Sequence, residues 1–266
     1  FPHNLMIAEE STAFPGVTMP PEYDGLGFNF KWNMGWMNDA LFYIGVDPIG
    51  RQHNHDKLTF PIMYACNENY ILPISHDEVV HGKGSLIGKM PGSYDEQFAG
   101  VRSFILYMLC HPGKKLMFMG SEIGQFAEWN FSKELEWFLL KYESHKKLQT
   151  FFSEANHFYL KHKSLWELDC SWEGFKWICH NDNTRNIVSF RRIDRDENEL
   201  IVLVNFSPVL WEDYYVGVPC EGSYKEIFNT DLKKFGGSGI RNTKMLKTIK
   251  GETHGYGQYI SVNVPP

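Results

Sequence analysis

Three short apolar segments of this chain run directly into charged residues, and this repeated pattern limits what the chain can fold into. The charged groups are Glu9 after segment 4–8, His76 and Asp77 after segment 70–74, and Glu122 after the segment that begins at Lys114. Apolar segments of this length are typical of buried strands. Charged groups packed against such strands are costly if they are buried without partners. We therefore predict that these strands deliver their charged groups to a common site.

Helical patterns separate the predicted strands. Asn38 or Asp39 is predicted to cap a first helix, and apolar residues at helical spacing over 98–109 predict a second. A third helical region is predicted over roughly 134–163. Strands that alternate with helices indicate an α/β sheet, and in α/β barrels the chemistry lies at the C-terminal ends of the strands.

The pattern changes near Trp166. Short strand-like segments then follow one another, including 199–207 and 223–229, and no helical period is visible. Short strands at close spacing predict an antiparallel β-sandwich. We predict an α/β domain over residues 1–165 and an all-β domain over residues 166–266. Only about four βα units precede the boundary, where a (β/α)8 TIM barrel needs eight, so the first domain is predicted to be the C-terminal half of a barrel.

Composition excludes some classes of protein. A net charge of −6 argues against a general nucleic-acid binder, and no apolar run approaches the length of a membrane span. The five cysteines form no CxxC pair, which predicts free thiols in a reducing compartment, the cytoplasm. The chain opens at Phe1 without an initiator Met or a signal peptide, and this predicts a beginning within a longer protein.

Four motifs carry a resemblance to a known family. MIAEEST, FKWNMGWMND, LPISHDEVVHGKGS and GSEIGQFAEWN occur in this order. Together they resemble the bacterial glycogen branching enzymes of the α-amylase clan, glycoside hydrolase family 13, along essentially the whole chain. The resemblance implies a transferase of glycogen biosynthesis that acts on α-glucan without a cofactor. It also implies cleavage of an α-1,4 link and transfer of the chain to a 6-hydroxyl.

The resemblance assigns catalytic roles by motif. It implies that Glu9 is the general acid/base and that Asp77, which follows His76, stabilises the transition state while His76 donates to a sugar hydroxyl. The family's nucleophile is an Asp within a GFRxDAV-like motif, and residues 1–266 contain no such motif. A retaining glycosidase needs both carboxyl groups, about 5–5.5 Å apart. We therefore expect this chain alone to be inactive.

Other residues have both a functional and a structural interpretation. The candidates for sugar contact are Trp32, Trp36, Glu78, His81, Glu122 and Trp129. Core packing is the alternative for the first two tryptophans, and support of neighbouring residues or of a loop rim is the alternative for the others. The histidine-containing segment 53–56 is predicted to be a solvated loop and not a metal site. Arg191 and Arg192 are predicted to be surface charges.

Two other functions remain open at this point. One is a different activity of the α-amylase clan, such as glycosyltrehalose hydrolysis. The other is a noncatalytic glucan-binding protein made of a degenerate half-barrel and a β domain. Glu9 and Asp77 both stand in intact motifs, which favours the enzyme.

Overall fold

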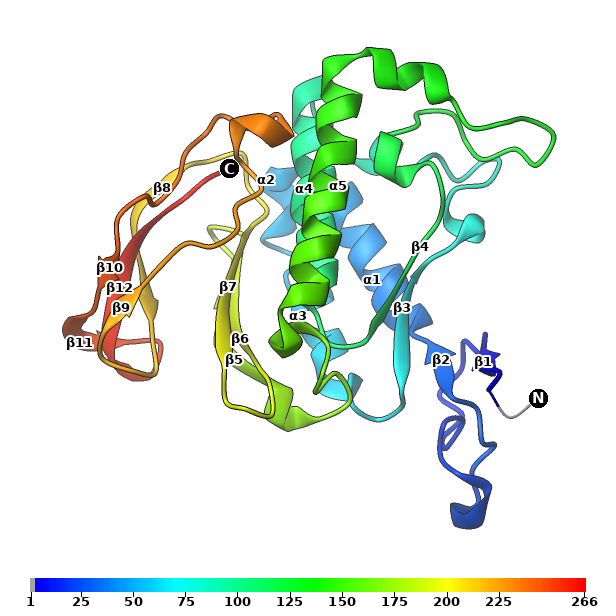
Figure 1. Ribbon diagram of the computed structural model, residues 1–266, viewed down its shortest axis with the longest axis horizontal. Helices are drawn as coiled ribbons and strands as arrows, with labels where there is room; N and C mark the ends of the chain where they lie inside the picture. Colours follow the sequence, from blue (N-terminus) through cyan, green and yellow to red (C-terminus); the bar gives the residue numbers. More distant parts are fainter. Residues whose placement is uncertain (1–2) are drawn as a thin grey trace.

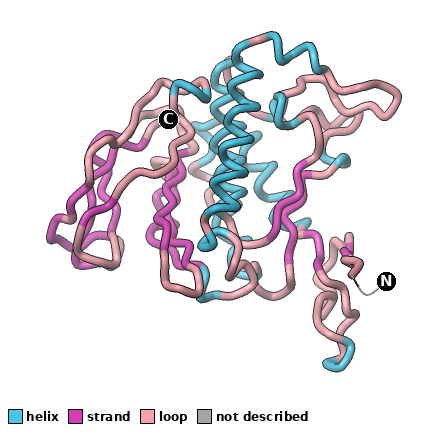
Figure 2. The backbone as a smooth tube through the Cα atoms, in the orientation of Figure 1, coloured by secondary structure: helices cyan, strands magenta, loops and turns pink. Residues whose placement is uncertain are grey.

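The computed structural model describes residues 3–266, which form an α/β region followed by an all-β region (Figures 1 and 2). The α/β region is built on one parallel four-stranded sheet in the order β1-β2-β3-β4. Its strands are β1 (Ile7–Ala8), β2 (Phe30–Trp32), β3 (Tyr70–Ile74) and β4 (Lys114–Met117). The predicted strand segments are therefore present, although the first is shorter than its apolar pattern.

Three α-helices lie between β2 and β3, one lies between β3 and β4, and one follows β4. They are α1 (Met34–Gly45), α2 (Pro48–Arg51), α3 (Asp56–Thr59), α4 (Tyr94–Cys110) and α5 (Glu143–Lys161). The cap predicted at Asn38 or Asp39 is wrong, because the Asn33 side chain accepts the backbone N–H of Trp36 at 2.9 Å and starts α1 earlier. The third helical region begins at Glu143 and not near 134, since a separate 3-10 helix occupies Trp137–Lys141.

The hydrophobic core joins the two regions. Helices α1, α4 and α5 pack with β3, and Trp36, Leu72 and Phe104 have no exposed surface. The same cluster continues into the all-β region through Phe190 and Val202. Because one core spans both regions, burial alone marks no break between them, and the boundary near residue 165 stays a prediction.

The all-β region contains two antiparallel three-stranded sheets and a short ribbon. One sheet has the order β5 (Phe175–Asp182), β6 (Ile187–Ile193), β7 (Glu199–Asn205). The other has the order β11 (Ile249–Thr253), β12 (Tyr256–Val264), β8 (Trp211–Gly217), and the ribbon pairs β9 (Ser223–Tyr224) with β10 (Leu246–Lys247). Of the strand predicted over 223–229, only the first two residues are paired.

The side chains of Arg191 and Arg192 have very different environments. Arg192 has no exposed surface, and its guanidinium donates to the Cys110 carbonyl at 2.6 Å and to the Asp169 carboxylate at 2.7 Å. The prediction of a surface charge is therefore wrong for Arg192. Arg191 lies on the opposite face of the strand, half-buried, and pairs with Glu199.

Two predictions from composition can be compared with the described residues. The five cysteines Cys66, Cys110, Cys170, Cys179 and Cys220 are free, as predicted, although Cys170 and Cys220 are exposed. Within residues 3–266, no helix combines the length and the apolar character that crossing a membrane requires.

Candidate functional site

The candidate site lies at the carboxyl edge of the parallel sheet. Because all four strands run in the same direction, the residues that follow them emerge at one edge. Glu9 follows β1, His76 and Asp77 follow β3, and Glu122 follows β4. Strand β2 separates the first of these positions from the second. The structure thus brings the predicted groups to one edge, as their strand-end positions indicated.

A buried capping box holds the turn after β3. The Glu78 carboxylate accepts the backbone N–H of Ser75 at 2.6 Å and its hydroxyl at 2.8 Å, and the Ser75 hydroxyl accepts the N–H of Asp77. The Glu78 side chain is buried beneath the turn. The structure therefore contradicts the predicted sugar contact for Glu78 and shows that it supports the turn carrying His76 and Asp77.

His76 and Asp77 are about half exposed, and their side chains contact each other. His76 Nε2 lies 3.2 Å from Asp77 Oδ1, and the two side chains keep 45% and 53% of their surface. The His76 ring packs edge-on against Trp129, with 5.9 Å between ring centroids, and at 6.1 Å from Phe118. Aromatic packing on one side of the imidazole fixes its position and leaves the other side, with Asp77, open to a ligand.

A carboxylate that the sequence reasoning missed organises the glycine-rich loop after His81. Glu128 accepts the backbone N–H groups of Gly84 at 2.8 Å and Gly82 at 2.9 Å, and it lies 3.3 Å from His81 Nδ1. The hydrogen bond from Gly84, followed by that from Gly82, lowers the pKa of Glu128. Both glycines have positive φ, which explains the glycines of this motif. The glutamate within the segment FAEWN was the feature of the sequence that could have identified this carboxylate.

The loop after β3 and the loop after β4 line an open cavity at Trp129, whose ring packs against His76. The cavity has a volume of about 530 Å³ and is lined by Val80, His81, Glu128, Trp129, Asn130 and Phe131. The backbone N–H of Trp129 donates to the Val79 carbonyl at 2.8 Å and joins the two loops. Two of the predicted contact residues, His81 and Trp129, therefore share one cavity.

Glu9 is exposed, whereas its neighbour Glu10 is tied to the sheet. Glu9 makes no ion pair or hydrogen bond with the rest of residues 3–266, and its carboxyl group is free to meet a ligand. Glu10 lies 2.6 Å from the buried Lys31 Nζ on β2. This hydrogen bond from Lys31, with further ones from Thr12, lowers the pKa of Glu10 to about 2. Glu10 therefore has a structural role, because it connects the segment after β1 to β2.

The remaining candidates separate into core and site residues. Trp36 has no exposed surface and packs its ring on Phe104 at 6.1 Å, so the prediction that it contacts substrate is wrong and core packing holds. Trp32 is half-buried at the end of β2 and stays a prediction. Glu122 accepts the N–H of Gly120 at 2.8 Å, which stabilises the turn after β4 and leaves its sugar contact untested.

The histidine-containing segment before β3 holds no recognisable metal cluster. Within residues 3–266, no group of three or more His, Cys, Asp or Glu side chains is arranged to bind a metal. His55 is nevertheless buried, at 7% exposed, and burial lowers its pKa. The prediction of a solvated loop therefore holds for the exposed His53 but is wrong for His55.

Sequence comparisons identify relatives along the whole chain. A family model described as the alpha amylase C-terminal all-beta domain matches residues 177–266. The 1,4-alpha-glucan branching enzyme GlgB of Halothermothrix orenii is 50% identical over 267 residues, which cover 100% of this chain and 42% of that enzyme. The enzyme of the same name from Aquifex aeolicus is 51% identical over the same shares. The chain therefore spans about two fifths of the length of these curated relatives.

Solved structures show the same fold at low identity. A cyclomaltodextrinase matches with a TM-score of 0.61 at 17% identity, covering 99% of this chain and 39% of that one. The alpha-amylase from H. orenii matches with a TM-score of 0.57 at 14% identity, covering 98% and 51%. Identities this low establish likeness of fold alone.

Proposed function

This chain is homologous along its whole length to the bacterial 1,4-alpha-glucan branching enzymes, as its four motifs predicted, and we propose that it supplies the acid/base half of such an active site. The proposed reaction cleaves an α-1,4 link of a glucan and transfers the released chain to a 6-hydroxyl, as in glycogen biosynthesis. The observation that carries the proposal is the position of the exposed Glu9 and of the His76–Asp77 pair at one edge of the parallel sheet.

Glu9 is proposed to move the proton. As the general acid it protonates the leaving glycosidic oxygen, and as the general base it then deprotonates the incoming 6-hydroxyl. The exposed position of Glu9 supports this assignment. The neighbouring acid, Glu10, is already paired with Lys31 and is therefore less available to a substrate. Water as the acceptor would give hydrolysis, so exclusion of water at this edge favours transfer.

Asp77 and His76 are proposed to bind the sugar ring at the bond that breaks. Hydrogen bonds from sugar hydroxyls to the Asp77 carboxylate strengthen as the ring flattens toward its oxocarbenium-like state. His76, held by Trp129 and Phe118, donates to a hydroxyl of the same sugar. The capping box of Ser75 and Glu78 supports this role, because it fixes the turn before substrate binds.

The open cavity at Trp129 is proposed to hold the neighbouring glucose unit. Trp129 and Phe131 offer aromatic faces, and His81 and Glu128 offer polar groups at its wall. Trp32 and Glu122 are kept as further candidates for glucan contact at the same edge.

The rest of the active site is proposed to come from a longer parent protein. The segment before β2 exposes a series of apolar side chains, namely Leu5, Met6, Ile7, Phe14, Met19, Tyr23 and Leu26. In a (β/α)8 barrel these side chains and the open edge of β1 would pack against the preceding strands. We therefore propose that residues 1–165 are half of such a barrel, that residues 166–266 form a sandwich domain, and that the chain alone lacks the nucleophile and is inactive. Its free cysteines support a cytoplasmic parent.

The parent enzyme with Glu9→Gln tests the proposed function. Loss of the proton donor should reduce branching by about 10²–10⁴-fold in an iodine-staining assay, while binding of linear glucan stays nearly unchanged. Glu10→Gln is the matched control and should retain most of the activity, because Glu10 is paired with Lys31 and is not proposed to contact the substrate.

Three results would contradict the assignment. A Glu9→Gln enzyme that branches at near-parent rate removes the role of Glu9. Release of trehalose from a trehalose-capped glucan, without a change in iodine staining, identifies glycosyltrehalose hydrolysis instead. A parent that binds glucan but forms neither product identifies a noncatalytic binding protein.

A further inference from the structure

The imidazole ring of His81 is fully exposed at the cavity that Trp129 and Phe131 line, and one carboxylate faces it. Glu128 Oε2 lies 3.3 Å from His81 Nδ1, within hydrogen-bonding distance. The second ring nitrogen, Nε2, has no hydrogen-bond partner among residues 3–266. One nitrogen of the ring is therefore occupied by the protein, and the other is open to a ligand.

The two oxygens of the Glu128 carboxylate have different partners. Oε1 accepts the backbone N–H groups of Gly82 at 2.9 Å and Gly84 at 2.8 Å, whereas Oε2 faces His81. Both glycines have positive φ, and a Cβ at either position would meet no atom within 4 Å. Glycine is therefore needed here for the backbone conformation and not for space. This conformation aims two donors at Oε1 and leaves Oε2 to His81.

Glu128 acts only as a hydrogen-bond acceptor in this arrangement. The hydrogen bonds from Gly84 and then from Gly82 lower the pKa of its carboxyl group, with a further contribution from His81. An ionised carboxylate has no proton to donate, so the proton of the contact lies on His81 Nδ1. A neutral imidazole carries one proton, and Nε2 is then a bare acceptor.

The loop that carries His81 has other supports. The Lys89 ammonium group donates to the Lys83 carbonyl, and the backbone N–H of Trp129 donates to the Val79 carbonyl at 2.8 Å. These hydrogen bonds hold the loop after β3 from two sides. The contact between the carboxylate and the imidazole is therefore not needed to keep the loop in place, and its main consequence is the position of the imidazole proton.

We propose that His81 recognises a glucan hydroxyl by accepting its hydrogen on Nε2, and that Glu128 is the positioning residue that holds the tautomer this requires. The inference rests on the proposed function for the identity of the ligand, an α-1,4-glucan. The rings of Trp129 and Phe131 supply apolar surface in the same cavity. A sugar oxygen that carries a methyl group has no hydrogen to donate, so a bare Nε2 selects free hydroxyl groups.

Nitrogen NMR of the 266-residue chain, labelled with nitrogen-15 in its histidines, tests the tautomer. In alkaline buffer the His81 ring should show a protonated Nδ1 and a bare Nε2. A His81→Gln chain identifies the resonances, and a cooperative thermal transition shows that the chain is folded. Glu128→Gln should reverse the tautomer, because the glutamine carbonyl keeps the bonds to Gly82 and Gly84 while its amide donates to Nδ1.

Equilibrium binding to the parent enzyme tests the selection of hydroxyl groups. The probes are maltoheptaose and maltoheptaose with methylated hydroxyl groups. The parent should prefer the first ligand, and Glu128→Gln should reduce this preference about tenfold, as expected for one hydrogen bond. His81→Ala should show the same loss. Adding Glu128→Gln to that variant should change nothing further, because Glu128 acts through His81.

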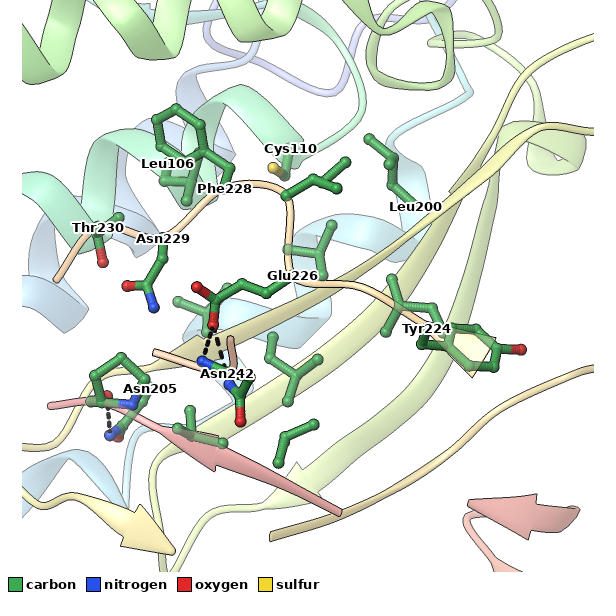
Figure 3. Close-up of a pocket in the computed structure, with 18 of the residues that line it drawn as sticks. Leu106, Cys110, Leu200, Asn205, Tyr224, Glu226, Phe228, Asn229, Thr230 and Asn242 are labelled. Carbon is green, nitrogen blue, oxygen red and sulfur yellow. Dashed lines mark hydrogen bonds between the residues drawn. The ribbon is translucent and has the colours of Figure 1, made fainter. Parts of the chain in front are cut away.

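A second carboxylate with two N–H donors provides the control. Glu226 lies at a cavity of about 440 Å³ between β7 and the segment 223–230 of the all-β region (Figure 3). It accepts the backbone N–H of Asn242 at 2.9 Å and the side-chain amide of the same residue at 3.0 Å. No histidine is among the described residues that line this cavity. Glu226→Gln should therefore leave the tautomer of His81 and the preference for hydroxyl groups unchanged.

Three results would overturn the proposal. A bare Nδ1 in the folded, unsubstituted chain shows that Glu128 does not set the tautomer. An unchanged ligand preference in Glu128→Gln shows that Nε2 does not recognise a hydroxyl group. A loss in Glu128→Gln that persists in the His81→Ala background shows that Glu128 acts by holding the loop. Failure of the proposed function is distinguishable, because a Glu9→Gln parent that still branches removes the catalytic assignment without changing the tautomer or the ligand preference.

Discussion

The two halves of the parallel sheet differ in how firmly the rest of the chain holds them. Strands β3 and β4 are covered by α1 and α4 and are linked to the all-β region through Lys114, which binds Asp169, and through Arg192. Strand β1 has only two residues, and the segment before β2 extends away from the body of the molecule (Figure 1). A few hydrogen bonds hold this segment, such as those that the Glu68 carboxylate accepts from the N–H groups of Val17 and Thr18.

The proposed catalytic residues are divided between these two halves. His76 and Asp77 follow β3 in the anchored half, where the buried capping box positions them. Glu9 follows β1 in the projecting half, where its side chain is exposed. The geometry of Asp77 is therefore determined by contacts within this chain, whereas few contacts within residues 3–266 hold the segment that carries Glu9. The predictions below test this difference, from the largest expected effect to the smallest.

Removal of the buried arginine of the anchored half should have the largest effect. Arg192→Met leaves Asp169 in the interior with Lys114 as its remaining partner, and we expect the free energy of unfolding to fall by about 3 kcal/mol. The matched Arg191→Met removes a partly exposed pair with Glu199, whose side chains keep 20% and 21% of their surface, and should cost less, about 1 kcal/mol. Urea unfolding of both variants measures the difference. Equal losses would show that burial at the junction does not anchor β4.

Acid should destabilise the anchored half through His111. Burial lowers the pKa of this histidine to about 3, against an ordinary value of about 6.5. The unfolded chain then binds a proton below pH 6.5 that the folded chain does not, so this contribution is complete above pH 6.5 and is lost as the pH falls toward 3. The slope should approach about 1.4 kcal/mol per pH unit. His111→Phe should reduce this slope.

The buried capping box should contribute more than an exposed one. Ser75→Ala removes the hydroxyl that contacts the Glu78 carboxylate, and we expect a loss of about 2 kcal/mol because that carboxylate is buried. Ser93→Ala breaks the equivalent box with Glu96 at the exposed start of α4 and should cost about 1 kcal/mol. Chemical denaturation compares the two. If Ser93→Ala costs as much as Ser75→Ala, the turn after β3 is not specially stabilised.

The smallest effect is expected in the projecting half. Glu10→Gln removes the ion pair with Lys31, so amides near Thr12 should exchange faster while the unfolding temperature hardly changes. Since the pKa of Glu10 is lowered to about 2, the pair is fully formed above about pH 4.5 and is lost as the pH falls toward 2. Glu9→Gln is the neighbouring control and should leave exchange unchanged. A clear loss of global stability in Glu10→Gln would mean that this half is also anchored.

Much of the local structure could be predicted because it depends on neighbouring residues. The apolar pattern predicted β3 and β4, and the helical spacing over 98–109 predicted α4, which ends at Cys110. The strand-end positions of Glu9 and Asp77 followed from the same patterns. Errors arose where a nearby polar group competed, as when Asn33 capped α1 before Asn38. The carboxylate of Glu128 was missed because its partners, Gly82 and Gly84, lie far away in the sequence.

The sequence by itself indicated the resemblance to a family, the order of strands and helices along the chain, and the acids that follow the strands, because motifs and periodicity are local. Only the tertiary structure decided that Trp36 and Arg192 are buried, since their contacts come from Phe104, Asp169 and other distant positions. It also decided that β7 has an open edge, because strand pairing depends on segments that the pattern of one strand does not specify. Burial of a side chain and pairing of a strand both require two distant segments to come together, and the local pattern of one segment does not specify its partner.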